Sequence, residues 1–378
     1  MLSNWSKYKI LLYAIAYMGV IAHTYEPLDL LESAKNPEEL SDVVIFQDPF
    51  PDITAISYSK DPSMPRTIPC PNPSDIMPCE CYPISNTTID INCSNVTSEE
   101  QIRSIFNKPF PFTNFRTLTI KGNLYVNVLR GGDLGKCTFQ NIDIRDSALI
   151  EIDESVLEDS YETLLTLVLI NNNLNTIPDI SQFRRLWYLD FQYNALLEFP
   201  LLYSNTLTKL VLQGYPWETV PGDALQNLPA LESLDISYCS LYNIKPDTFS
   251  NNQLGYINLG GNNIEFIPNN AFKLIGSNNT VMLHYNRIST VPPGAFSGIT
   301  GTLQMSHNSL KYLSEEVWRP LLESNVMLYI EGNPFECGCD IAWLILNETL
   351  LSRIHDTARC YDGEAFTDLN PEWYENMC

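Results

Sequence analysis

The chain has 378 residues, which is long enough for one to three domains. Hydrophobic residues make up 44% and charged residues 18%, a composition that supports a large core and excludes an extensively disordered chain. Asp and Glu number 45 against 22 Lys and Arg, and the formal net charge is -23. Such an acidic surface repels phosphate backbones and anionic membranes, so we expect no nucleic-acid partner.

Residues 1–22 predict a signal peptide. Lys7 and Lys9 precede an apolar run over 10–21, and Val20 and Ala22 provide the small side chains of a cleavage site after Ala22. The run is shorter than the roughly 20 apolar residues of a spanning helix, although an uncleaved anchor is the alternative. No later stretch is apolar enough to cross a bilayer, and no hydrophobic tail for a lipid anchor precedes Cys378. We expect a secreted, extracellular protein without a membrane span.

Residues 23–69 form an acidic, proline-rich arm with seven prolines, nine acidic residues and three basic residues. Because proline interrupts helices and central strands, we expect the arm to be disordered, with a propeptide or a short binding segment as the alternative. Glycosylation sequons agree with export. They lie at Asn86, Asn95, Asn278 and Asn347, and more weakly at Asn92, where Cys93 is the middle residue.

Residues 115–332 repeat the template Leu-x-x-Leu-x-Leu-x-x-Asn-x-Leu, whose positions we number 1 to 11. Ten copies start 21 to 25 residues apart, and such a period indicates a solenoid. The first copy places Tyr125 at position 11, and a degraded fifth copy has Tyr215 in place of the asparagine, followed by Trp217. The sequence predicts an α/β solenoid, a leucine-rich repeat horseshoe.

Each template position has a physical reason. Positions 4 to 6 form a short strand whose alternate side chains face inward. The asparagine at position 9 turns its amide toward backbone groups that would otherwise be buried without partners, and Cys239 takes this position in one copy. Phe272 and Phe296 follow in the second halves of their copies, and we expect their rings to stack on the convex side. We expect the Tyr215-Pro216-Trp217 departure to reshape the concave face.

Cysteine clusters predict the caps that a solenoid needs at both ends. Residues 70–114 form the N-terminal cap, and residues 333–378 form the C-terminal cap, which overlaps the last repeat. In an exported chain disulfides are favoured over the competing zinc site, although spacing alone cannot give their pairing. Cys137 and Cys239 remain; about four strand spacings separate them, which is beyond disulfide reach. We expect Cys239 to be a buried thiol and Cys137 a free thiol or an intermolecular link.

The sequence contains no local signature of catalysis, such as H-E-x-x-H, G-x-S-x-G or a phosphate-binding loop. The histidines at 284 and 307 lie at strand ends of separate copies rather than at metal-ligand spacing. We therefore predict no enzyme activity, no catalytic residues, no cofactor and no metal site.

The outward residues of the strands predict a binding face on the concave side. Exposed Trp and Tyr often supply the energy of interfaces, although tyrosine also simply favours strands. Position 8 alternates as Tyr193, Gly214, Tyr238, Gly261, Tyr285. The aromatic and acidic character suits a basic or mixed protein partner, and stacking on a sugar is possible. The predicted partner-binding residues are Trp187, Tyr188, Asp190, Gln192, Tyr193, Asp235, Tyr238, Tyr256, Asn258, His284 and Tyr285.

The C-terminal cysteines surround Asn333-Pro334-Phe335 and Ala342-Trp343-Leu344, a pattern that resembles the C-terminal cap of extracellular leucine-rich repeat proteins. The N-terminal stretch from Cys70 to Cys93, with residues 101–120, resembles the arthropod secreted proteins typified by the non-catalytic subunit of Oplophorus-luciferin 2-monooxygenase. The resemblance covers residues 68–378. It implies the disulfides Cys70–Cys81, Cys79–Cys93, Cys337–Cys360 and Cys339–Cys378.

That resemblance also implies a function. It implies an extracellular, non-catalytic binding protein. Together with the predicted binding face, it leads us to expect a secreted, non-catalytic leucine-rich repeat protein that binds another protein on its concave face, with an accessory subunit of an extracellular complex as one form of that role. The alternatives are a structural component of the extracellular matrix and the non-catalytic subunit of a luciferase-type monooxygenase.

Overall fold

The structure of the protein is a computed structural model that describes residues 70–85, 88–250 and 253–378. All of these residues belong to one unit of the chain, Met64–Cys378. The predicted signal peptide over 1–22, the acidic arm over 23–69 and the sequon at Asn86 lie outside the described residues.

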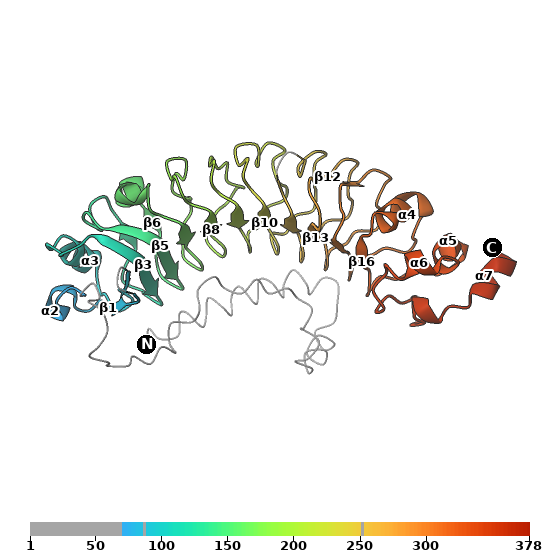
Figure 1. The fold of residues 1–378 in the computed structure, drawn as a ribbon, viewed down its shortest axis with the longest axis horizontal. Helices are drawn as coiled ribbons and strands as arrows, with labels where there is room; N and C mark the ends of the chain where they lie inside the picture. Colours follow the sequence, from blue (N-terminus) through green and yellow to red (C-terminus); the bar gives the residue numbers. More distant parts are fainter. Residues whose placement is uncertain (1–69, 86–87, 251–252) are drawn as a thin grey trace. The chain divides into compact units, whose positions relative to one another are not determined.

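One sheet runs through the described region, and its strands pair in parallel except for the antiparallel first pair. Figure 1 shows these strands along the inner side of the curved repeat array, with the return segments on the outer side. In spatial order the strands are β1 (Glu80–Pro83), β2 (Ile89–Asn92), β3 (Asn114–Lys121), β5 (Thr138–Arg145), β7 (Thr166–Val168), β8 (Tyr188–Asp190), β9 (Lys209–Val211), β10 (Ser233–Asp235), β11 (Tyr256–Asn258), β13 (Thr280–Met282), β15 (Thr302–Gln304) and β16 (Met327–Tyr329).

The register of the sheet places position 4 of each copy opposite position 4 of the next. Leu189 pairs with Leu210, and Leu210 pairs with Leu234. All three side chains are fully buried, as alternation along a strand requires of the inward-facing residue. The leucine-rich repeat solenoid predicted from the period of the sequence is therefore confirmed.

The asparagines at position 9 connect neighbouring copies. In the copy of β13, Nδ2 of Asn286 donates to the carbonyl of Leu259 in the preceding copy at 2.9 Å and to its own Leu283 carbonyl at 3.1 Å. Its Oδ1 accepts from the Ile264 N–H at 3.0 Å. Asn308 and Asn333 repeat this arrangement in the next two copies. The amide thus satisfies buried backbone groups in two copies at once, as predicted.

Three copies replace the asparagine, and two of them keep the hydrogen bond to the preceding copy. The other has Ser147, whose hydroxyl donates to the carbonyl of Arg145 in its own copy at 2.8 Å and accepts from the Asn123 N–H at 3.1 Å. The Tyr215 hydroxyl donates to the carbonyl of Phe191, and the Cys239 thiol donates to the carbonyl of Leu212 at 3.1 Å. Tyr215 also stacks on Trp217 with ring centroids 4.4 Å apart, and both rings are buried. The expectation that this departure reshapes the concave face is wrong, because the two rings fill the core instead.

The first copy departs from the predicted alignment by one residue. Tyr125, expected at the buried position 11, is 61% exposed, whereas Val126 is buried. Oδ1 of Asn123 accepts from the backbone N–H of both residues, at 2.9 Å each. This turn places the side chain of Val126, rather than that of Tyr125, in the core.

The outer side of the array is held by stacked phenylalanines. Phe249, Phe272 and Phe296 stack in sequence with centroid separations of 5.1 and 5.3 Å, as predicted for the last two. Short strand pairs accompany the return segments: β12 (Phe272–Lys273) pairs with β14 (Phe296–Ser297), and β4 (Val128–Leu129) pairs with β6 (Glu151–Ile152). A 3-10 helix, η3 (Glu154–Ser160), follows β6.

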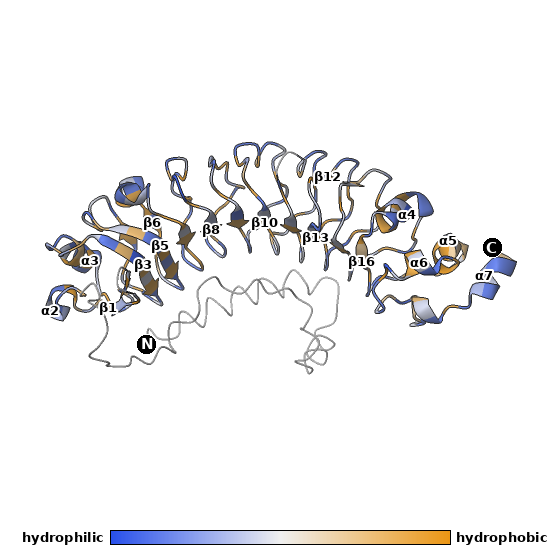
Figure 2. Cartoon of the chain, in the orientation of Figure 1, coloured by the Kyte–Doolittle hydropathy of each residue, from blue (hydrophilic) through white to orange (hydrophobic). Residues whose placement is uncertain are grey.

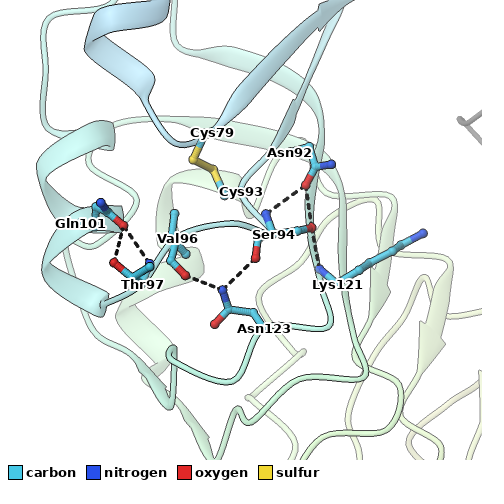
Figure 3. The surroundings of a disulfide bond; sticks show 9 residues. All are labelled: Cys79, Asn92, Cys93, Ser94, Val96, Thr97, Gln101, Lys121 and Asn123. Atoms are coloured by element: carbon cyan, nitrogen blue, oxygen red, sulfur yellow. Dashed lines mark hydrogen bonds between the residues drawn. A yellow bond between two sulfur atoms is a disulfide. The ribbon is translucent and has the colours of Figure 1, made fainter. Parts of the chain in front are cut away.

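The N-terminal cap contains α2 (Pro73–Ile76), α3 (Glu99–Phe106) and two disulfides, Cys70–Cys81 and Cys79–Cys93. Figure 3 shows how the second disulfide adjoins the first repeat: Ser94 accepts from the Lys121 N–H at 2.8 Å, and Asn123 donates to the Val96 carbonyl at 2.7 Å. The asparagine of the first copy therefore donates to a backbone carbonyl of the cap, as later asparagines donate to a carbonyl of the preceding copy.

The C-terminal cap follows the last strand, with disulfides Cys337–Cys360 and Cys339–Cys378. All four disulfides have the pairing that the family resemblance implies. Figure 2 shows polar and apolar residues on different sides of α4, whose apolar residues are buried over the end of the core. The helices here are α4 (Glu315–Glu323), η4 (Cys339–Ile341), α5 (Ala342–Ile345), α6 (Glu348–Leu351), η5 (Phe366–Asp368) and α7 (Pro371–Met377).

Cys137 and Cys239 are both unpaired and buried in the described region. Burial, with the Asp159 charge as a second cause, raises the pKa of the Cys137 thiol to about 12. Burial likewise raises the pKa of the Cys239 thiol to about 12. The prediction for Cys239 is confirmed. The alternative of an intermolecular disulfide at Cys137 is wrong for the folded protein, because this sulfur is not accessible to another chain.

We predict that Asn286→Ala lowers the free energy of unfolding by about 2–4 kcal/mol, because each buried polar group left without a partner costs about 1–3 kcal/mol. Urea denaturation followed by circular dichroism measures the change. The control is Asn175→Ala, at an exposed asparagine of the same array, which should change stability by less than about 0.5 kcal/mol. Equal effects of the two substitutions would contradict the role assigned to Asn286.

We predict that both thiols resist iodoacetamide in the native protein, because the reactive thiolate is scarce at about pH 8 when the pKa is near 12. Alkylation in guanidinium chloride without reductant should label both residues, and mass spectrometry of tryptic peptides reads the result. Rapid labelling of native Cys137 would show that this thiol is accessible after all.

Candidate functional site

Outward-facing residues at positions 2, 3, 5, 7 and 8 of the copies form the candidate site on the concave side of the sheet. The strands position them, because side chains alternate between the core and the concave surface along each strand. The site divides into an N-terminal part with paired charges and a central and C-terminal part with aromatic rings.

The charged part was not recognised in the sequence. Arg116 on β3 forms a bidentate ion pair with the buried Asp90 of β2. In the next copies Asp143 on β5 pairs with Lys121 at 3.2 Å and also with Arg145. The sequence could have indicated these pairs, because residues of opposite charge occupy outward positions of consecutive strands. Each of the two carboxylates is therefore compensated by at least one cation, and Asp143 is shared by two.

Two residues predicted to contact a partner are buried. Tyr188 is 5% exposed and Asp190 is 3% exposed. Trp187 stacks on the Tyr188 ring with centroids 5.6 Å apart, and the Lys209 ammonium lies 4.8 Å from the centre of that ring. The Tyr188 hydroxyl donates to Asp190 at 2.8 Å. The Tyr188 ring therefore supports the Trp187 ring, and Asp190 holds the Tyr188 hydroxyl. Neither residue presents surface to a partner.

The polar residues at position 5 are engaged with the chain. Asp235 accepts from the N–H of Ser237 at 3.0 Å and from Gln213 and Asn258 at 2.9 and 3.0 Å. Asn258 in turn accepts from the Gly260 N–H at 3.0 Å. These contacts end each strand in a turn and link three copies. Asp235 and Asn258 remain partly accessible, as do Gln192 and Tyr256, whose hydroxyl lies 3.3 Å from Met282 Sδ.

Position 8 has a positive φ in all ten copies, and in four of them it carries a ring. We call Tyr193, Tyr238, Tyr285 and His307 the aromatic ridge; their φ values lie between 52° and 57°. Glycine and asparagine adopt this conformation readily, but bulky side chains do so at a cost of about 1–3 kcal/mol each. Rings at these positions are therefore not explained by backbone preference.

Glycines of the following copies make room for the ridge. A Cβ atom on Gly214 would lie 2.4 Å from the Tyr193 ring, and one on Gly261 would lie 2.4 Å from the Tyr238 ring. Tyr285 instead stacks on His307, with parallel rings 4.4 Å apart, and His307 lies against Gly332. The alternation of Tyr and Gly noted in the sequence thus reflects direct packing between copies. The ring of each tyrosine is supported on one side, and all three tyrosines are more than 40% exposed.

His284 stands beside the ridge at position 7. Its ring lies against Gly260 and meets Tyr285 edge-on with centroids 5.6 Å apart. Burial lowers the pKa of His284, and the Asp235 charge opposes this shift. Among the described residues no three His, Cys, Asp or Glu side chains are grouped as metal ligands would be.

The sequons in the described region differ in accessibility. Asn95 and Asn278 are exposed. Asn347 is partly buried and caps α6, accepting from the Leu350 N–H at 3.1 Å through Oδ1. Within the described ranges, no helix has both the length and the apolar character needed to cross a membrane.

Comparisons with known proteins agree with this architecture. The family model described as leucine rich repeat matches residues 205–264 and 229–277. The chain is 28% identical over 221 residues to osteomodulin of Rattus norvegicus, covering 55% of this chain and 52% of that protein. A chain in the solved octameric complex of Latrophilin 3, Unc5D and FLRT2 superimposes with a TM-score of 0.62 at 21% identity, covering 76% of this chain and 91% of that one, which supports the fold.

A further relative covers nearly the whole chain. It is the Oplophorus-luciferin 2-monooxygenase non-catalytic subunit of Oplophorus gracilirostris, 36% identical over 330 residues, which cover 85% of this chain and 91% of the relative. The chain therefore belongs to the family of extracellular leucine-rich repeat proteins that includes this subunit.

Proposed function

We propose that this chain is a secreted, non-catalytic protein that binds another protein on its concave face. The single observation that carries the proposal is the aromatic ridge, in which four rings adopt a backbone conformation that costs energy and present accessible surface. Conformational strain of this kind is retained mainly where function requires it.

The ridge has the properties of an interface anchor. Aromatic side chains bury a large area on binding, and they lose little conformational entropy because they rotate about only two bonds. Packing of Tyr193 on Gly214 and of Tyr238 on Gly261 restricts the rings further before a partner arrives. Trp187, whose ring stacks on Tyr188, adds a further accessible ring near the ridge.

Secretion and the absence of catalysis are supported by different observations. Four disulfides are expected of a protein that folds in an oxidising compartment. The relative that covers most of the chain is named a non-catalytic subunit. The polar residues at position 5, Asp235 and Asn258, are occupied with hydrogen bonds to each other and to the ends of their own strands.

A second candidate function follows from the same relative. In this candidate the chain is the non-catalytic subunit of a luciferase-type monooxygenase, and its partner is the catalytic chain. Copurification of an oxygenase chain with the secreted protein would favour this candidate over an immune or matrix partner. A structural role in the extracellular matrix is the remaining alternative, and it predicts incorporation into an insoluble network.

We predict that replacing Trp187, Tyr193, Tyr238 and Tyr285 together with alanine reduces partner capture by tenfold or more. Anchor residues at interfaces typically contribute about 2 kcal/mol or more each, and 1.4 kcal/mol is a factor of about ten in affinity. The measurement is affinity purification from the secretions of the protein's own tissue, with quantitative mass spectrometry of the captured proteins.

The matched control replaces three tyrosines and one tryptophan that are exposed elsewhere: Tyr125, Tyr203, Tyr361 and Trp373. Circular dichroism and urea denaturation must show that both quadruple variants fold. If the two variants retain or lose the same partners, the concave face is not the binding surface.

We predict that Asp190→Asn stabilises the protein by roughly 2 kcal/mol at neutral pH and leaves partner capture unchanged. Burial raises the pKa of the Asp190 carboxyl to about 6, from about 3.9 in an unfolded chain. The wild type therefore loses stability as the pH rises from about 4 through 6, because the unfolded chain releases this proton first. Urea midpoints between about pH 4 and 7 should show that this loss is smaller in the variant.

A further inference from the structure

The spacing of the aromatic ridge defines what kind of chain can lie along it. Tyr193, Tyr238 and Tyr285 belong to the copies of β8, β10 and β13, and one strand separates each consecutive pair in the sheet. Strands are about 4.8 Å apart, so consecutive tyrosines recur at about 9.6 Å. A bound segment that uses all three rings must present a side chain with this period on one face.

Three regular conformations can be compared with this period. A polyproline II segment rises about 3.1 Å per residue and repeats its face every three residues, or about 9.3 Å. A helix repeats its face after seven residues, about 10.5 Å, and a strand after two residues, about 6.8 Å. Over the two intervals of the ridge the polyproline II segment accumulates a mismatch of about 0.6 Å, and the helix accumulates about 1.8 Å.

The chemistry of the ridge agrees with the same conformation. Proline-rich segments dock on surfaces lined with aromatic rings, since their conformation is preformed and little entropy is lost on binding. Tyr hydroxyls and the Trp187 indole can donate to the backbone carbonyls, which make no internal hydrogen bonds in polyproline II. The ridge tyrosines supply three such hydroxyls from a rigid support of glycine or histidine.

The charge of the surface beside the ridge indicates which other residues a bound proline-rich segment would carry. Carboxylates accompany the ridge at Asp235 on β10 and at Glu331, which follows β16, and the chain as a whole carries a net charge of -23. The backbone N–H of His307 donates to the Glu331 carbonyl at 2.7 Å, which places Glu331 next to the end of the ridge. Lys or Arg side chains on the bound segment would be favoured here over acidic ones.

We propose that the aromatic ridge binds a basic, proline-rich segment of the partner protein in the polyproline II conformation, with every third residue packed against a tyrosine. This inference rests on the proposed function and specifies the chemistry of the partner. The spacing of the three ridge tyrosines selects a segment with this period. The neighbouring carboxylates favour basic side chains on that segment.

The test uses synthetic peptides and the full chain. One peptide has proline at every third position with lysines between, and a second has the same numbers of prolines and lysines in an order without that period. Isothermal titration calorimetry should give at least tenfold tighter binding of the first peptide. Tyr238→Ala should reduce that binding by tenfold or more, and Tyr361→Ala, at an exposed tyrosine of the C-terminal cap, should leave it unchanged.

A glycine variant tests the ridge without removing a ring. Gly261→Ala places a Cβ against the Tyr238 ring and strains a backbone with φ of +66°, so peptide binding should fall about as far as in Tyr238→Ala. Gly222→Ala has no atom within 4 Å of the added Cβ and should bind as the wild type does. Circular dichroism checks that the variants fold. If Gly261→Ala unfolds, Tyr238→Phe takes its place as the test, because it keeps the ring and should retain most of the affinity.

The possible failures are distinguishable. Equal affinities for the two peptides, or binding that Tyr238→Ala does not weaken, would overturn the inference while leaving intact a partner capture that depends on the concave face. Loss of that dependence in the quadruple-variant experiment would remove the proposed function and this inference together. Self-association of the chain that Tyr238→Ala abolishes would assign the ridge to a second copy and likewise overturn the inference.

Discussion

The structure depends on one constraint: from the third copy onward, a side chain at position 9 donates a hydrogen bond to a strand-end carbonyl of the preceding copy. Asn286 satisfies groups of two copies at once, so neither copy can be completed without its neighbour. Two copies without the asparagine keep this hydrogen bond, since the Tyr215 hydroxyl and the Cys239 thiol donate to the equivalent carbonyls. At these positions the hydrogen-bond donor is retained although the residue type is not.

This constraint also produces the candidate site. A side chain that turns inward at position 9 requires a sharp change of direction just before it, and position 8 accordingly adopts a positive φ in every copy. A ring at position 8 points away from the core and packs against the next copy, as Tyr193 does on Gly214. The site is therefore a by-product of the turn that buries the asparagine, and rings placed at that turn are arranged in a row by the stacking of the copies.

The sequence predicted the repeats and caps well because each depends on local chemistry. Apolar residues at a fixed period have to share one core, and the cysteines lie close together along the chain. The site was predicted less well. Whether an outward residue is accessible depends on its lateral neighbours, and Trp187 and Lys209 cover Tyr188 in a way that alternation along one strand cannot reveal. The alternation of tyrosine and glycine was visible, but the contact between Tyr238 and Gly261 exists only once the copies stack.

The placement of the disulfides has a mechanical consequence. The four bonds join residues that are 11, 14, 23 and 39 positions apart, and each lies within one cap. Among the described cysteines none forms a bond between two central copies, so those copies are coupled only by noncovalent contacts with their neighbours. Small rotations at each junction can add along the array, and the hollow of the solenoid can widen or narrow elastically without any covalent bond being strained.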